Sequence, residues 1–354
     1  MVHVGANPGR SGHRLSAQAA RIVFDTRQDL AELFGISDSR QIVFTSNATA
    51  GLNIALHGML DPQDHVVTTS MEHNSVMRPL RHLARERGVR LTVVAADREG
   101  RVDPAAIREA LEPKTRLVAI NHGSNVVGCI QPIAEIKEAI GKVPLLVDAA
   151  QTAGSYPFSI ERDGIDLLAF SGHKSLLGPA GTGGLYVRPG LDLPPLVRGG
   201  TGSRSESDQQ PDFLPDKYES GTLNTCGIAG LGASVRFILE RGVETIHNHE
   251  MNLLDVFLER LRRIEGVVLY GPSSTEARLP TVSLNVEGKS PSQVGGLLDK
   301  RHDIMVRVGL HCAPDAHRTI GTFPDGTVRF SAGALNTTDE MEQAVAAVDE
   351  IARS

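Results

Sequence analysis

The feature that most constrains the fold of this sequence is a repeated alternation of short apolar runs with helix-like segments. The runs are rich in β-branched residues, and helical periodicity separates most of them, for example at 75–87 and 133–141. Near-continuous apolar runs are typical of strands that are buried on both faces of a parallel sheet. The sequence therefore predicts an α/β fold whose sheet is covered by helices. The predicted strands are 41–45, 65–69, 90–95, 116–121, 144–148, 166–171 and 181–187, and a helix at 15–34 precedes them.

The second part of the chain follows a different pattern. Residues 189–224 are rich in Gly, Pro, Ser and Asp and predict a long irregular connection. A helical stretch at 228–265 leads to a second set of short elements. We therefore expect a large domain over 1–229 and a small α+β domain over 230–354. The predicted strands of the small domain are 267–270, 281–286, 305–308 and 327–332, and its predicted helices are 291–300 and 338–352.

Composition and charge exclude several classes of function. The formal net charge is −6 and the isoelectric point about 6.1, and no block of Lys or Arg offers a footprint for nucleic acid. No apolar run is long enough to span a bilayer and no signal-like segment begins the chain, so we expect a cytoplasmic protein without a membrane partner. The cysteines Cys129, Cys226 and Cys312 lack paired spacing, which argues against a disulfide framework or a metal site.

Polar residues follow several predicted strands, at the edge where open α/β sheets bind ligands. Lys174 comes three residues after one apolar run, and Asp148 ends another. A lysine shielded from water loses its proton readily and forms imines with carbonyls, although the position fits a solvated loop lysine equally well. Asp148 by itself is more typical of a turn or a helix cap than of a partner for a pyridine nitrogen. Together, the two residues favour a cofactor site.

Eight motifs along the chain, taken together, resemble one known family. On them the chain is similar to the class V fold of pyridoxal-phosphate (PLP)-dependent transferases, and within it to group II cysteine desulfurases and selenocysteine lyases. The resemblance covers nearly the whole chain and implies fold type I, with a mainly parallel sheet in the large domain, and PLP as cofactor. The motifs are Asn47-Ala48-Thr49, Glu72-His73, Ser124-Asn125-Val126-Val127-Gly128, Asp148-Ala149-Ala150-Gln151, Ser171-Gly172-His173-Lys174, Glu219-Ser220-Gly221-Thr222, Arg307-Val308-Gly309-Leu310-His311-Cys312-Ala313 and Val328-Arg329-Phe330-Ser331.

The resemblance implies a role for each residue around the cofactor. Lys174 would carry PLP, and Asp148 would pair with the ring nitrogen. His73 would stack on the ring, and Gln151 would bind its phenolic oxygen. Thr222 would reach the phosphate of the other subunit, which implies a homodimer with shared active sites. The residues expected to hold the phosphate within one subunit are Ala48, Thr49, Ser171 and His173.

The resemblance also implies how the substrate is bound and attacked. Asn125 and Arg329 would clamp the carboxylate of L-cysteine, because a bidentate arginine gives orientation as well as charge. Positive neighbours would favour the thiolate form of Cys312, which would take the sulfur as a persulfide while alanine leaves. A free cysteine is otherwise commonly a small buried hydrophobe, and this is the role we expect for Cys129 and Cys226.

Several alternatives remain open at this point. A class V aminotransferase, or a lyase acting on selenocysteine or another amino acid, would use Lys174 and Asp148 without needing Cys312. The opening element of the family, of the type Asp-Asn-Ala-Ala-Thr, is not found before residues 5–13. We expect that its loss would weaken the substrate pocket, which allows a third alternative, an inactive PLP-binding scaffold. The sulfur acceptor is not indicated by any motif.

Overall fold

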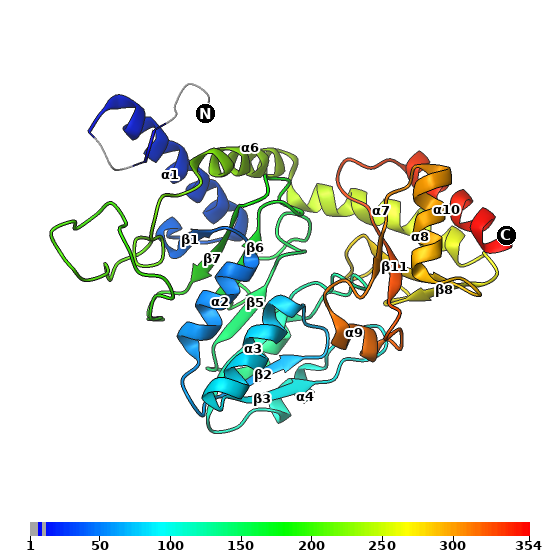
Figure 1. Ribbon diagram of the computed structural model, residues 1–354, viewed down its shortest axis with the longest axis horizontal. Coiled ribbons are helices and arrows are strands. Elements are labelled where there is room, and N and C mark those ends of the chain that lie inside the picture. The colour runs from blue at the N-terminus through cyan, green and yellow to red at the C-terminus, as the bar shows by residue number, and fades with distance from the viewer. Residues whose placement is uncertain (1–5, 9–11) are drawn as a thin grey trace.

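The computed structural model describes residues 6–8 and 12–354 and contains a seven-stranded and a four-stranded sheet with helices around them (Figure 1). The expectation for residues 5–13 falls partly outside the described residues. The order of the large sheet is β1-β7-β6-β5-β4-β2-β3, and every strand lies where the sequence predicts it. These strands are β1 (Ile42–Thr45), β2 (His65–Thr69), β3 (Arg90–Val94), β4 (Thr115–Asn121), β5 (Leu145–Asp148), β6 (Leu167–Ser171) and β7 (Gly183–Val187).

Helices cover both faces of the large sheet, as the continuous apolar runs predict. Neighbouring strand residues alternate between two cores, so that Leu146 packs on one face and Val147 on the other. Helices α2 and α3 fill the first core, and α1, α4, α5 and α6 fill the second. Their bounds are α1 (Arg14–Phe34), α2 (Ala48–Met59), α3 (Asn74–Arg87), α4 (Pro104–Glu109), α5 (Ile133–Ile140) and α6 (Thr225–Arg241).

The antiparallel strand β7 brings a helix end to the edge of the sheet where the other strands finish. β7 pairs with β1 and β6, and Gly183 lies opposite Ser171 at the end of β6. A Cβ atom on Gly183 would come within 2.7 Å of the Cα atom of Asn47, the N-cap of α2. The absence of a side chain at Gly183 therefore allows the N-terminus of α2 to lie against Ser171.

The connection between β7 and α6 is irregular, as predicted, and no helix or strand interrupts residues 188–224. The helical stretch expected at 228–265 is instead two helices, α6 and α7 (Val243–Leu261). They are separated by Gly242, whose φ of 82° and ψ of 130° no helix can contain. Apolar residues on both sides of this glycine hide the break from the sequence pattern.

The small sheet is antiparallel, in the order β10-β11-β9-β8, and has an apolar core of its own. The expected boundary at 229/230 falls within α6, whose side chains pack in the core of the large sheet, and it stays a prediction. No helix of the described residues is long and apolar enough to cross a membrane. The remaining elements are β8 (Val267–Tyr270), β9 (Thr281–Val286), α8 (Pro291–His302), β10 (Arg307–Gly309), α9 (Pro314–Thr319), β11 (Thr327–Ser331) and α10 (Thr338–Arg353).

Candidate active site

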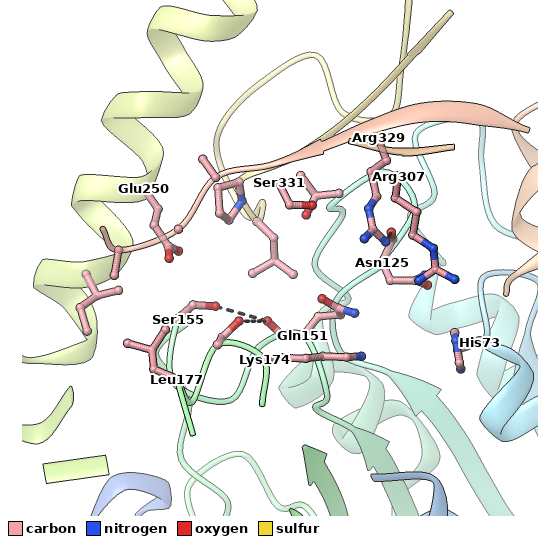
Figure 2. A pocket seen from close by; sticks show the side chains of 18 residues that line it. His73, Asn125, Gln151, Ser155, Lys174, Leu177, Glu250, Arg307, Arg329 and Ser331 are labelled. Carbon is pink, nitrogen blue, oxygen red and sulfur yellow. Dashed lines mark hydrogen bonds between the residues drawn. The ribbon is translucent and has the colours of Figure 1, made fainter. Parts of the chain in front are cut away.

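A cavity of about 290 Å³ lies where the strand ends of the large sheet face the small sheet (Figure 2). The large sheet contributes residues that follow β2, β4, β5 and β6. The small sheet contributes two arginines, which lie opposite each other in the β10–β11 pair. Residues that the sequence places far apart thus meet around one space. Its polar lining includes His73, Asn125, Gln151, Lys174, Arg307 and Arg329.

Lys174 lies three residues beyond the end of β6, is half-buried and lines the cavity, which favours a cofactor site over a solvated loop lysine. Burial lowers the pKa of its ammonium, and the positive charges of Arg329 and Arg307 act in the same direction. The negative charge of Asp148 opposes this shift. Lys174 therefore loses its proton more easily than an exposed lysine, as a nucleophilic amine requires.

Asp148 is the last residue of β5, and only 6% of it is exposed. Its Oδ1 atom accepts a hydrogen bond from the backbone of Ala150 at 3.0 Å. Burial raises the pKa of the carboxyl group, while the charge of Lys174 opposes the change. Nearby, the fully buried Glu72 has its pKa raised to about 8, mainly by burial. A cationic group placed next to Asp148 would relieve the cost of its burial.

His73 caps α3 and lines the cavity between the large sheet and Arg307. Its Nδ1 atom accepts a hydrogen bond from the backbone N–H of Ser75 at 3.1 Å. Burial lowers the pKa of the imidazole to about 4, and the charge of Lys174 adds to the effect. His73 is therefore neutral near pH 7 and, because Nδ1 accepts, carries its proton on Nε2.

The residues expected to hold a phosphate lie beside the cavity rather than in its lining. The backbone N–H of Ala48, at the start of α2, donates to Ser171 Oγ at 3.1 Å. Thr49 Oγ1 lies 2.8 Å from Ser75 Oγ, which in turn lies 2.9 Å from His73 Nδ1. Because a twelve-residue helix presents N–H groups and a positive dipole end at this point, the cluster suits an anion. His173 is exposed, two residues after Ser171.

Ser75 is a member of this cluster that none of the eight sequence motifs contains. It connects the expected phosphate group at Thr49 with the expected ring contact at His73. Its position in the first turn of α3, two residues after the cap, is the only signal that points to it.

The arginine and asparagine expected to bind a carboxylate are already coupled to each other. Arg329 Nη1 donates to the backbone oxygen of Asn125 at 2.8 Å, and Asn125 Nδ2 donates to the backbone oxygen of His311 at 2.8 Å. The buried Nε atom of Arg329 has no hydrogen-bond partner among the described residues. An anion in the cavity would supply the missing acceptor for this N–H group.

Cys312 is exposed, so it does not pack as a small hydrophobe. Arg307 Nη2 donates to its Sγ atom at 3.3 Å, which places the thiol next to a residue that lines the cavity. Cys129 is buried, and burial raises the pKa of its thiol to about 12, as expected for an inert cysteine. Cys226 is exposed, and the expectation that it packs as a small hydrophobe is wrong.

Thr222 lies outside the cavity of Lys174, whereas Glu250 belongs to its lining. Thr222 is exposed and lines a different cavity, of about 250 Å³, together with Arg27 and Glu219. One subunit therefore does not bring Thr222 into the cavity of Lys174.

Glu250, on α7, lines the cavity of Lys174. The sequence does not predict this position, because a glutamate in a helix is usually solvated. Its pKa is raised to about 8 by burial.

The fold and this site define the class of protein. A mainly parallel sheet, a half-buried lysine at its strand edge and a pair of arginines from a smaller sheet are the features of the PLP-dependent transferase fold. The chain belongs to the aminotransferase class-V family, whose family model matches residues 2–344.

Relatives and solved structures agree with this assignment. The chain is 36% identical to a probable cysteine desulfurase of Methanothermobacter thermautotrophicus, with 98% of this chain and 88% of the relative aligned. It is 30% identical to a cysteine desulfurase of Haloferax volcanii, over 97% of this chain and 82% of the relative. An apo cysteine desulfurase from Thermococcus onnurineus has a similar structure, with a TM-score of 0.93, 33% identity and coverage of 99% and 88%.

Proposed function

We propose that this chain is a PLP-dependent cysteine desulfurase that converts L-cysteine to L-alanine and holds the sulfur as a persulfide on Cys312. The observation that carries the proposal is the contact between Arg307 and the exposed Cys312 thiol, beside the cavity that contains Lys174. An aminotransferase needs the lysine but has no use for a thiol at this position. The relatives that are named cysteine desulfurases support the same reaction.

The side chains of the site fit PLP. When bound, PLP supplies a carbonyl that captures amines and a protonated ring that withdraws electrons from the substrate Cα atom. The buried carboxyl of Asp148 suits the protonated ring nitrogen, and the half-buried amine of Lys174 suits the carbonyl. We assign the ring face to His73 and the phenolic oxygen to Gln151.

The phosphate of PLP would lie at the N-terminus of α2. Donors from one subunit are the backbone of Ala48 and the side chains of Thr49, Ser171 and His173. We propose that Thr222 completes this set from the second subunit of a homodimer, because it is exposed and lines a different cavity from that of Lys174 in its own chain.

The chain's own residues then orient the substrate and move its protons. Arg329 and Asn125 would hold the carboxylate of L-cysteine, which fixes the direction of the Cα–H bond. Lys174, whose pKa burial lowers, would take the Cα proton on Nζ. The neutral His73 would keep the ring in place without adding a competing charge.

In the sulfur step, the reacting group of this chain is the thiol of Cys312. The Cys312 thiolate would attack the substrate sulfur, forming an S–S bond while the C–S bond breaks. The electron pair of the C–S bond stays with carbon, which takes up a proton to become the methyl group of alanine. The Arg307 guanidinium lies 3.3 Å from Sγ and would stabilise negative charge on the sulfur throughout this step.

Free thiols persist in the reducing cytoplasm, where we propose that the enzyme acts.

The test measures L-alanine released from L-cysteine by the purified protein with PLP and a reductant. We expect Cys312→Ala to lose alanine formation while it keeps the absorbance of bound PLP, and Lys174→Ala to lose the imine absorbance. Cys226→Ala is the matched control, because it removes a second exposed thiol, and it should retain full activity.

Other outcomes would identify another function. A native rate in Cys312→Ala would show that the nucleophile is assigned wrongly. A keto acid product in place of alanine would indicate an aminotransferase. A folded, PLP-loaded protein without turnover of cysteine or selenocysteine would indicate a binding scaffold.

A further inference from the structure

The loop that carries Cys312 is held by a chain of buried hydrogen bonds that begins at His311. The Nε2 atom of His311 lies 3.0 Å from Thr327 Oγ1 on β11. Thr327 Oγ1 donates to Ser283 Oγ on β9 at 2.9 Å, and Ser283 Oγ donates to the backbone oxygen of Val126 at 2.6 Å. All four residues are at most 2% exposed, so solvent does not compete for these bonds.

The donor and acceptor atoms in this series of hydrogen bonds fix which atom donates in each bond. The carbonyl of Val126 can only accept, so the single hydroxyl proton of Ser283 is used there. Ser283 must then accept from Thr327, which uses the only proton of that hydroxyl. Thr327 Oγ1 has no proton left for His311 and must accept one from Nε2–H. The imidazole of His311 is therefore held in a single tautomer.

A second set of hydrogen bonds connects the loop after β4 with the loop that carries Cys312. Asn125 is the neighbour of Val126, and its Nδ2 atom donates to the backbone oxygen of His311 at 2.8 Å. Arg329 Nη1 binds the backbone oxygen of Asn125 at 2.8 Å. The two sets form a closed network that couples the Cys312 loop to the side chains proposed to bind the substrate carboxylate.

The backbone of this loop needs such support. His311 and Cys312 have φ values of 49° and 60°, in the left-handed region that non-glycine residues seldom adopt. Consecutive residues in this region persist only where surrounding contacts hold them. The carbonyl of Cys312 is also fixed, by the backbone N–H of Asn74 at 2.8 Å.

We propose that His311 is a positioning residue, which orients the Cys312 thiol through Thr327 and Ser283 and does not remove its proton. This inference rests on the proposed function of Cys312. Nε2 of His311 is already a donor, and the buried Nδ1 has no hydrogen-bond partner among the described residues. Neither nitrogen therefore forms a hydrogen bond with the thiol, as a base would. Burial and the charge of Arg329 also lower the pKa of the imidazole to about 3.

The experiment measures persulfide formation on Cys312 in a single turnover, with one equivalent of L-cysteine and the PLP-loaded enzyme. His311→Gln keeps an N–H donor near the position of Nε2, whereas His311→Leu removes it. Thr327→Ser keeps the hydroxyl, whereas Thr327→Val removes it. Thr322→Val is the matched control, because Thr322 binds the neighbouring His317 at 2.7 Å outside the network. Thermal unfolding and PLP absorbance verify that each variant is folded and loaded.

We expect His311→Leu and Thr327→Val to form the persulfide at least about tenfold more slowly, since each breaks the chain of buried hydrogen bonds that holds the Cys312 loop. His311→Gln, Thr327→Ser and Thr322→Val should stay within about threefold of the native rate, a change of under 1 kcal/mol. If His311→Gln is as slow as His311→Leu, a basic imidazole is needed and the inference is overturned. A native rate in Thr327→Val, or equal losses in Thr322→Val and Thr327→Val, would overturn it as well. Absence of persulfide from the unaltered enzyme would instead contradict the proposed function.

Discussion

At the residue scale, burial shifts the protonation of the site in opposite directions for acids and bases. It raises the pKa of Asp148 and lowers the pKa values of Lys174 and His73. In each case the loss of water disfavours the charged form. The result is a histidine that is neutral near pH 7 and a lysine that releases its proton more readily. Both properties suit a site that binds an amine and moves a proton from carbon.

Glu250 allows a direct test of this effect on stability. Its folded-state pKa is about 8 against an ordinary 4.5, and burial is the cause. Between these values the folded chain keeps a proton that the unfolded chain has lost, so stability falls as pH rises from about 4.5 through 8. Glu250→Gln removes this loss. We expect the variant to be more stable than the native protein by roughly 1–4 kcal/mol at pH 9 and about equal to it at pH 5.

Urea unfolding at pH 5, 7 and 9 measures this difference. Glu244→Gln, an exposed position on the same helix, should show no comparable pH dependence. A stability difference between Glu250→Gln and the native protein that is the same at every pH would contradict a buried, protonated carboxyl.

At the element scale, the periodicity of apolar residues along the sequence predicts where individual strands and helices lie. The seven strands of the large sheet lie where apolar β-branched runs occur. In the small sheet, β10 begins two residues later than the predicted run at 305–308, and its side chains are largely exposed. The order of the strands and the antiparallel direction of β7 depend on pairing between distant segments, which no local pattern records. The break at Gly242 was missed because apolar residues continue on both sides of it.

The same limit applies to the candidate site. Lys174 and Asp148 were predicted because strand ends of one sheet must meet at one edge. Glu250 was not, because its burial depends on how α7 packs against the strands, and its sequence context is that of an ordinary amphipathic helix.

The ion pair between Arg27 and Glu219 connects α1 to the irregular connection before α6. Two hydrogen bonds of 2.8 and 3.0 Å join the side chains, which are each about 7% exposed. Glu219 also accepts from the backbone N–H of Phe44 on β1 at 2.6 Å. We expect Arg27→Met to destabilise the protein by about 3–5 kcal/mol, because it leaves a buried carboxylate without its cation.

Chemical denaturation of three variants tests the pair. The double variant Arg27→Met/Glu219→Gln should recover part of the loss, since it removes the unpaired charge as well. Arg353→Met breaks an exposed pair with Asp349 and should cost at most about 1 kcal/mol. If Arg27→Met and the double variant are equally unstable, the loss comes from packing and not from the uncompensated charge.

At the scale of the whole molecule, neither sheet contains the complete site. The large sheet supplies Lys174 and Asp148, and the small sheet supplies Arg307 and Arg329 from one antiparallel pair. Helix α7 leads from one part to the other and adds Glu250 to the cavity (Figure 1). Thr222 lines another cavity of the same chain. Its proposed role at the phosphate therefore requires the second subunit of the proposed homodimer.

Mixed dimers test whether Thr222 acts on the partner subunit. We expect Thr222→Val to lower the affinity for PLP and Lys174→Ala to abolish activity. In a dimer with one chain of each kind, one of the two sites combines the intact Lys174 of one chain with the intact Thr222 of the other. Such a dimer, isolated with two affinity tags and assayed at limiting PLP, should recover about half of the native activity per dimer, as one complete site of two implies. If Thr222 instead served the site of its own chain, no site of the mixed dimer would be complete, and its activity per dimer would be only about half of the low level of the Thr222→Val homodimer, because only one of its two sites keeps Lys174.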